Sequence, residues 1–562
     1  MAAPSNTPLS NAPEDADGQK FWESLSVDEV SAAGLQNVTV DVDADATVQT
    51  ESNSSSSASA DNVTGDSGAG STTDFNAGLQ GSSSFDVEAD AGIQGLAGTT
   101  ASSSASTSNG EAKAFTELVD SAGVQEVTRL EVGGELGALG QSINSLSADA
   151  ESVVGSAEST SKLTTLSDGF EASQIDVSSD AGIQGLSQLS NIADAETTKG
   201  DASSTATANT LQGADLNSLN VGGVASVTGQ ASLTNAASST NVEGTGSDNS
   251  DATASLTGSV EGLYTTSDTN AATGVTGGQT AGVDVSSDGT LTGLASISNS
   301  ASAESTASSA DANATASDVD GAEIGSVDIG GVGSITGQTS FAGSADATSV
   351  TGLTSTADAS LADADGLEGL AAINVSSDAG LTGINSVDLT ATSASTGGAS
   401  PSAASSIAEA TTLQGAQLGI NTDIGGVGNI GGQVDFNATA ASTNVTGSAT
   451  AGASLGDVKD SFAVPTTGGL TTGVDLGSLT TSTTSGLAQG LVTGTNGISI
   501  SGVRSYGTDI KSDGTLQGFA NLSNTADAST TDGAAAAGAY ANTIDGANLG
   551  DVNIGGVGSL TG

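Results

Sequence analysis

Carboxylates are the dominant titratable side chains of this 562-residue chain. It contains 65 Asp and Glu residues, eight Lys and Arg residues, and neither His nor Cys. Nucleophiles activated by an imidazole base, and zinc sites built from imidazole or thiolate ligands, are therefore excluded. Two kinds of chemistry remain open to carboxylates. A pair of acids can cleave a glycosidic bond, and a group of them can coordinate a hard cation such as Ca²⁺.

A glycosidase is the weaker of these interpretations. Some right-handed β-helices cleave polysaccharides, but such enzymes usually also use Arg, Lys, Tyr or Trp side chains to bind and polarise the sugar. This chain has one Trp, three Tyr and eight basic residues. We therefore expect a protein that is not an enzyme and has no catalytic residues.

Five aspartates stand at the start of a recurring motif and are the candidate metal ligands. The motif reads Asp-Ala-Gly-Ile-Gln-Gly-Leu in its first two copies and varies slightly in the others. Its aspartates are Asp90, Asp180, Asp288, Asp378 and Asp513. An Asp in such a Gly-containing segment most simply caps a turn. We expect capping rather than specific coordination, no cofactor, and at most weak or non-specific binding of Ca²⁺.

A second motif, Gly-Gly followed after five residues by another Gly, alternates with the first. It begins at Gly133, Gly222, Gly330, Gly425 and Gly555. In its Gly-Gly-Val-Gly form it resembles the opening of the calcium-binding nonapeptide of RTX proteins, but Ile335 occupies the position of the Asp ligand. We therefore expect the glycines of 330–333 and 425–428 to allow tight corners with positive φ.

The alternating motifs indicate one repetitive body rather than several domains. The intervals between copies lengthen in steps of about 20 residues, as they would if whole coils of a solenoid were inserted. We predict an all-β, elongated β-solenoid (β-helix) with a core of small residues and coils of about 18–22 residues. About 28 such coils, stacked roughly 4.8 Å apart, would form a rod on the order of 130 Å long.

Local patterns agree with strands. Alanines alternate with polar residues over 310–316, which is the period of a strand with one buried face. The core should be wider where larger side chains take over, at Val327, Ile329, Val332 and Ile335.

Proline marks the expected breaks in the solenoid, because it cannot donate a hydrogen bond to a strand ladder. Pro401 and Pro465 fall in unusually long intervals between motifs. We therefore place surface loops near 391–408 and 456–468, within a solenoid that continues from 36 to 562.

The first 35 residues differ in composition from the rest. They include the adjacent pair Phe21 and Trp22 and a helix-like run from Glu23 to Ala32. One interpretation is a cap over the first open coil, which would otherwise invite edge-to-edge aggregation. The other is an assembly segment, with Phe21 and Trp22 as its contacts, that docks on the far end of the next subunit.

The charge balance restricts the partners. A net charge of −57 with no cluster of Lys or Arg argues against nucleic acid, which needs basic groups to neutralise phosphates. No apolar run is long enough for membrane insertion, and the acidic N-terminus is unlike a signal peptide. Such a charge is best tolerated where salt screens it. We expect an extracellular or cell-surface location, reached by a route without an N-terminal signal peptide.

The chain has an acidic composition rich in Gly, Ala, Ser and Thr, and it lacks Cys. It also repeats the runs Ser-Ser-Asp-Ala-Gly and Ile-Gly-Gly-Val-Gly. In these features the chain, from about residue 36, resembles the large acidic β-solenoid filament, matrix and adhesin proteins of marine bacteria such as picocyanobacteria. The resemblance implies head-to-tail assembly of solenoids into a fibre or matrix outside the cell.

Two functional hypotheses follow. In the first, the protein is a structural homopolymer whose only partner is itself, an interpretation favoured by the stop at Gly562 within a motif. In the second, it is a monomeric adhesin or stalk that displays a binding tip. An ice-binding solenoid is less favoured, because a Thr-x-Thr pattern occurs only sporadically, as at 205–207.

Overall fold

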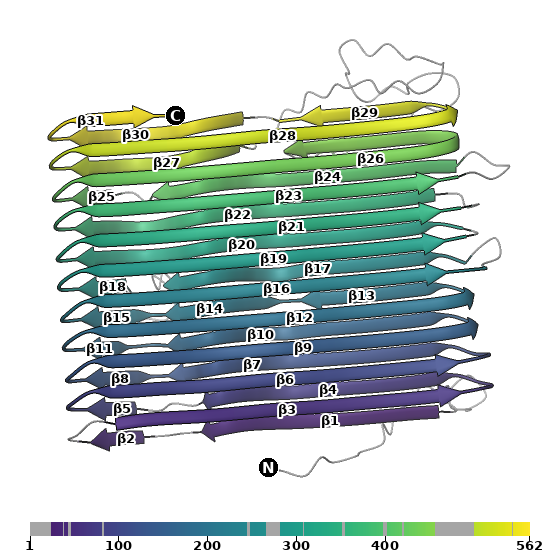
Figure 1. The fold of residues 1–562 in the computed structure, drawn as a ribbon, viewed down its shortest axis with the longest axis horizontal. Helices are drawn as coiled ribbons and strands as arrows, with labels where there is room; N and C mark the ends of the chain where they lie inside the picture. Colours follow the sequence, from purple (N-terminus) through teal and green to yellow (C-terminus); the bar gives the residue numbers. More distant parts are fainter. Residues whose placement is uncertain are drawn as a thin grey trace, which may run out of the picture.

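The computed structural model describes residues 24–36, 39–42, 46–80, 84–243, 248–265, 282–306, 308–350, 354–396, 402–418, 421–455, 499–541 and 543–562. In these ranges the chain is all β, and its strands pair in parallel throughout to form a β-solenoid (Figure 1). The predicted fold class is confirmed. Among the described residues, no helix has the length and apolar character needed to span a membrane.

Long strands on one side of the solenoid form what we call the front sheet. They are β3 (Ala46–Asn62), β6 (Ala91–Thr107), β9 (Leu136–Val154), β12 (Ala181–Lys199), β16 (Ala225–Asn241), β19 (Gly289–Ser305), β21 (Gly333–Ser349), β23 (Ala379–Ser395), β28 (Gly514–Asp532), the shorter β31 (Gly558–Thr561) and the first part of β26 (Gly428–Leu455).

The opposite side, the back sheet, contains long strands and the short strands that continue them. The long ones are β1 (Ser24–Gln36), β4 (Ser67–Gln80), β7 (Ala112–Val127), β10 (Ala157–Ala172), β13 (Ala202–Ala208), β14 (Thr210–Leu216), β17 (Ser250–Thr265), β20 (Ala310–Ile329), β22 (Thr354–Val375), β24 (Ser402–Leu418), β27 (Ser499–Ile510), β29 (Ala535–Tyr540) and β30 (Thr543–Ile554). The short ones are β2 (Thr39–Val42), β5 (Ser84–Val87), β8 (Arg129–Val132), β11 (Ile175–Val177), β15 (Ser218–Val221), β18 (Gly282–Val285) and β25 (Asn421–Ile424).

Each coil crosses the molecule twice and is about twice as long as predicted. Equivalent corner residues in neighbouring coils hydrogen bond across 45 residues, from Asp90 to Glu135, and across 44 residues, from Asp180 to Val224. The extra residues that suggested 18–22-residue coils fall at 266–281 and 456–498, outside the described ranges. Strands β15 and β18, which lie before and after the first of these segments, pair directly with each other. Strands β26 and β28, before and after the second segment, do the same.

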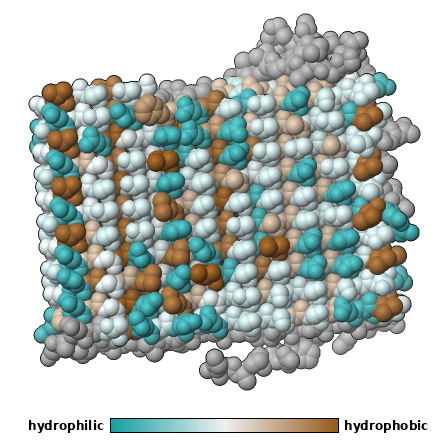
Figure 2. Space-filling model, in the orientation of Figure 1, coloured by the Kyte–Doolittle hydropathy of each residue, from teal (hydrophilic) through white to brown (hydrophobic). Residues whose placement is uncertain are grey.

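The longer coil changes the predicted shape. Because each coil uses more of the chain, fewer coils are stacked than a rod of about 28 would need. The longest dimension of the molecule runs along the strands rather than along the stacking direction (Figure 1). The body is a broad two-sheet slab, and the predicted thin rod is wrong. In-register stacking gathers residues of similar hydropathy into columns that run across the strands (Figure 2).

The core follows the predicted alternation with one exception. The alanines at 310, 312, 314 and 316 are buried, as are Val327, Ile329 and Ile335. Val332 is 47% exposed, so its assignment to the core is wrong. It follows Gly331 in the corner that leads to β21, where the strand alternation is interrupted.

Two columns of glycine bring the sheets into backbone contact along a line that we call the waist. A Cβ on Gly185 would lie 1.8 Å from the carbonyl oxygen of Gly213 in the back sheet. The same clash recurs in successive coils, as at Gly140 against Gly169 and at Gly229 against Gly262. The waist divides the core into a cluster with Phe170 and Ile183 and a cluster with Leu163 and Leu189.

Buried asparagines tie the two sheets together on one side of the waist. Asn191, Asn235 and Asn299 lie in register in adjacent front strands. The Nδ2 of Asn235 donates to the Ser255 carbonyl oxygen of the back sheet at 2.9 Å. Asn299 donates in the same way to the Thr315 carbonyl at 2.6 Å. These bonds satisfy backbone oxygens that face the core.

The predicted boundaries are partly wrong. Strand β23 continues to Ser395 and β24 begins at Ser402, so most of the predicted loop 391–408 is strand; its residues 397–401 and the whole of 456–468 lie outside the described residues. Strand β1 pairs with β4 from Ser24 onward, which contradicts the helix expected over 24–32. Residues 24–35 therefore belong to the first coil, whereas Phe21 and Trp22 lie outside the described residues.

Candidate functional site

The motif aspartates lie at the corner between the short back strands and the front strands. The Oδ1 of Asp180 accepts a hydrogen bond from the backbone N–H of Val224, in the same corner of the next coil, at 2.7 Å. The equivalent bonds join Asp90 to Glu135 at 2.8 Å, and Asp288 to Val332, Asp378 to Val427 and Asp513 to Val557 at 2.7 Å. The expected capping role is seen, although each carboxylate caps the turn of the neighbouring coil.

The Gly-Gly pairs make room for these aspartates. A Cβ on Gly223 would lie 2.2 Å from Asp180 Oδ1, and a Cβ on Gly222 would lie 2.5 Å from the Ser178 carbonyl oxygen. Coils with Asp at this corner therefore alternate with coils that carry Gly-Gly. Among the described glycines, positive φ occurs at the opposite end of the strands, at Gly65, Gly110, Gly155, Gly200, Gly447 and Gly533. The positive φ predicted for 330–333 and 425–428 is wrong, because the requirement there is steric.

The structure does not bring the corner aspartates together. Each is separated from the next along the stack by a coil with Gly-Gly, so no two occupy adjacent coils from Asp90 onward. In the described ranges, no three Asp or Glu side chains are already gathered as ligands for one ion.

A second group of acids, not identified from the sequence, lies along the back sheet beside the waist. Recurrent Asp-Gly-apolar-Glu runs, from Asp168, Asp320 and Asp365, are the signal that could have revealed it. Strand pairing places Glu261, Asp320 and Asp365 next to one another in three successive coils. We call the whole group the acidic ladder; it comprises Asp168, Glu171, Asp215, Glu261, Asp318, Asp320, Glu323, Asp363, Asp365 and Glu368.

The acidic ladder lies directly beside the waist, as Asp320 illustrates. Asp320 follows Val319, which packs in the core, and precedes Gly321 of the waist. Because side chains alternate along a strand, Asp320 faces away from the core that Val319 enters. It is nevertheless only 5% exposed, and its neighbour Asp365 is 4% exposed. Asp168 is 1% exposed.

Burial and like charge raise the pKa values of the ladder. For Asp320 and Asp365, burial is the largest cause that raises the pKa well above its usual value, followed by the charges of neighbouring acids. Burial, followed by the charges of Glu171 and Glu261, raises the pKa of Asp215 to about 7.

The flanking acids of the ladder are affected in the same way. Burial, and next the charges of Glu261 and Glu368, raise the pKa of Glu323 to about 8. Burial, followed by the charges of Asp318 and Glu368, raises the pKa of Asp363 to about 6. The back sheet thus concentrates carboxyl groups in a place where burial and like charge disfavour their ionised form.

Amide side chains donate hydrogen bonds to some carboxylate oxygens of the ladder, whereas other oxygens have no hydrogen-bond partner. Gln417 donates to Glu368 Oε1 at 2.7 Å, Gln212 donates to Glu261 Oε2 at 2.9 Å, and Gln414 contacts Asp365 Oδ2 at 3.4 Å. The Oδ1 of Asp365 and both carboxylate oxygens of Asp168 are buried without a hydrogen-bond partner.

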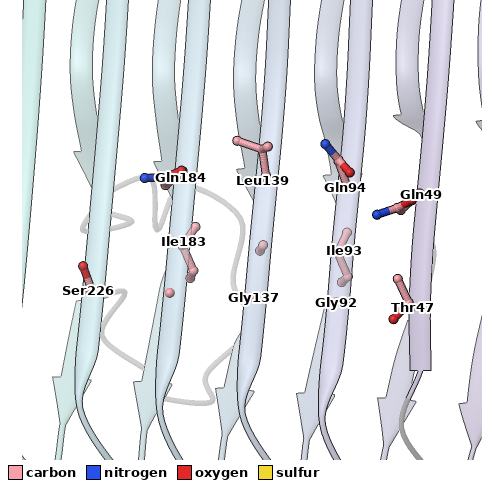
Figure 3. A pocket seen from close by; sticks show the side chains of 12 residues that line it. Thr47, Gln49, Gly92, Ile93, Gln94, Gly137, Leu139, Ile183, Gln184 and Ser226 are labelled. Atoms are coloured by element: carbon pink, nitrogen blue, oxygen red, sulfur yellow. The ribbon is translucent and has the colours of Figure 1, made fainter.

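The front sheet carries an open depression of about 410 Å³ that is lined by neutral groups (Figure 3). Strand pairing places Gly92, Gly137 and Gly182 in one column of it, and Gln94 and Gln184 lie two residues further along their strands. A Cβ on Gly137 would meet nothing within 4 Å, so packing does not require glycine there. The depression can hydrogen bond neutral polar groups but offers no charged side chain.

Comparison of the chain with protein-family models, curated proteins and solved structures gives no match. Function is therefore inferred from the stacking geometry, the corner aspartates and the acidic ladder.

Proposed function

We propose that the protein is a structural β-solenoid whose copies stack end to end into an extracellular fibre or matrix scaffold. The observation that supports this proposal most directly is the uniform join between coils. Front strands pair in the same register over their whole length, as in β12 with β9 on one side and with β16 on the other. Strand pairing between two copies can therefore repeat the strand pairing between coils of one copy.

The corner aspartates give such a stack a direction. An Asp corner hydrogen bonds the turn of the Gly-Gly corner that follows it in the chain, and this order holds from Asp90 to Val557. The backbone repeats the polarity, because the N–H of Gly222 donates to the Val177 carbonyl oxygen of the preceding coil at 2.7 Å. Copies that join by the same contacts must all point the same way, which is the head-to-tail geometry that yields open filaments.

The alternative function is a monomeric stalk or adhesin that displays a binding tip. The two proposals differ in the state of the isolated protein, since the stalk remains a single particle at all concentrations. The front-sheet depression with its amide groups would then be a neutral binding surface of the stalk.

Size-exclusion chromatography with light scattering and negative-stain electron microscopy of the full chain in high-salt buffer separate these functions. We expect regular fibres whose length grows with protein concentration. A variant that lacks residues 1–23 tests the assembly role proposed for Phe21 and Trp22 while it leaves every described strand in place. Single particles of the full chain at all concentrations would contradict assembly, whereas fibres from both proteins would contradict only the role of the N-terminal segment.

A further inference from the structure

Among the described residues, the charged groups that act on the three most buried acids of the ladder, Asp168, Asp320 and Asp365, are themselves all acids. The charged groups that act on Asp320 are Asp318, Asp365, Glu261 and Glu368, all of them acids. The cationic side chains of Lys113, Arg129 and Lys511 form ion pairs with other carboxylates, namely those of Glu111 and Glu158, of Glu131 and of Asp423. A buried carboxylate without a partner is costly, and buried charges in proteins are paired or bind cations.

Individual oxygen atoms of the ladder are available as ligands. Asp168 is 1% exposed, and neither of its carboxylate oxygens has a hydrogen-bond partner. Its charged neighbours are Glu171, Asp215, Asp120 and Glu261, so it lies within the acid-rich zone. Four coils further along the stack, Asp365 keeps Oδ1 unpartnered at 4% exposure.

The register of the strands sets the spacing of these ligands. Glu261, Asp320 and Asp365 occupy equivalent positions in adjacent coils, which lie about 4.8 Å apart. Ca²⁺ takes oxygen ligands at about 2.3–2.6 Å in flexible geometry, so one ion can lie between carboxylates of two successive coils. Mg²⁺ demands near-octahedral ligands at about 2.0–2.1 Å and fits a linear ladder less well.

We propose that the acidic ladder is a calcium-binding strip, in which each ion is shared between carboxylates of neighbouring coils and holds those coils together. The ligands are stacked rather than gathered, since no group of three acids in the described ranges already encloses an ion site. Binding therefore requires side-chain rotation, but no change in strand pairing. This proposal does not depend on end-to-end assembly.

The test compares the full chain with two double variants. Asp320→Asn with Asp365→Asn removes two ladder charges and preserves side-chain volume. Glu151→Gln with Glu196→Gln is the matched control, because these acids are also in register in adjacent coils but are exposed on the front sheet. Circular dichroism in EGTA first establishes that all three proteins fold. Equilibrium dialysis with radioactive Ca²⁺ then measures binding, and thermal unfolding is followed in Ca²⁺, in equimolar Mg²⁺ and in EGTA.

We expect Ca²⁺ to raise the Tm of the wild type and of the control variant more than Mg²⁺ does, and EGTA to reverse the rise. The ladder variant should bind fewer Ca²⁺ ions and lose the calcium-dependent rise in Tm. An equal rise in the ladder variant, or an equal effect of Mg²⁺, would assign the effect to general screening and overturn the proposal. A wild type that neither binds nor responds to Ca²⁺, but is stabilised by mild acid, would show that protons neutralise the ladder instead.

Discussion

Gly185 and Gly213 face each other from the two sheets with no space for a side chain. A Cβ on Gly185 would lie 1.8 Å from the Gly213 carbonyl oxygen, well inside van der Waals contact. The waist thus explains the last glycine of both sequence motifs, because Gly185 is the last glycine of one motif and Gly229 that of the other, and the two are paired in adjacent coils. Substitution here must move backbone rather than a flexible side chain.

Substitution of a waist glycine tests this contact. Gly185→Ala should lower the free energy of unfolding by about 1–3 kcal/mol, the usual cost of overpacking, as measured by urea denaturation. Gly137→Ala is the control, because a Cβ there meets nothing within 4 Å. It should be neutral or stabilise the protein by up to about 1 kcal/mol, since alanine orders more readily than glycine in a strand. Equal losses in the two variants would refute a special role of the waist.

The corner aspartates allow a second test at the scale of single residues. Asp180→Ala removes the acceptor of the Val224 N–H and should destabilise the protein by about 1 kcal/mol. Asp180→Asn keeps an oxygen acceptor at the same place and should recover part of that loss. Thermal unfolding of both variants in EGTA measures the difference. If Asn proves as damaging as Ala, the charge of Asp180 matters more than its hydrogen bond.

Pairing between neighbouring front strands places acids, as well as neutral residues, next to one another. Asp149 of β9 pairs with Asp194 of β12 in register. Partial burial, followed by the charges of Asp194 and Glu151, raises the pKa of Asp149. A carboxyl whose pKa is raised by folding stabilises the folded state most below its unfolded pKa of about 3.9, and that contribution is lost as the pH rises through the folded value.

Asp149→Asn should therefore be more stable than the wild type near neutral pH. The difference in Tm should disappear near about pH 3, where both proteins are uncharged at this position. Thermal unfolding at the two pH values checks this sign. A variant less stable than the wild type near pH 7 would show that favourable interactions of the Asp149 carboxylate outweigh its repulsion by Asp194 and Glu151.

The strands were predictable because their signal is local. The alternating alanines at 310, 312, 314 and 316 point inward as their spacing requires. The coil length was not predictable, because insertions at 266–281 and 456–498 separate strands that nonetheless pair directly. Sequence intervals alone cannot distinguish such insertions from whole coils.

The residues of the candidate site were predictable only in part. The repeated motif identified Asp180 and its equivalents, and turn chemistry suggested that they cap, but not that each caps the neighbouring coil. The acidic ladder was missed because its members meet only through strand pairing. Glu261 and Asp320 are in adjacent coils but belong to different, unequally spaced repeats.

For the molecule as a whole, net charge opposes the proposed assembly. Each copy carries a net charge of −57, so two copies repel each other as they approach. Salt shortens the screening length from about 10 Å at 0.1 M to about 3 Å at 1 M. Assembly should therefore be faster and more extensive at high ionic strength, as measured by light scattering in NaCl. Fibres that dissolve as NaCl is added would instead indicate ion pairs at the joint.

The proposed fibre requires coils to stack in register both within one copy and between copies. X-ray diffraction from oriented fibres tests it most directly, because hydrogen-bonded strands repeat about every 4.8 Å along the stacking axis. End-to-end stacking predicts a sharp reflection at this spacing on the meridian, parallel to the fibre axis. The same reflection on the equator would mean that copies associate through their sides, and a preparation that yields only single particles would contradict assembly altogether.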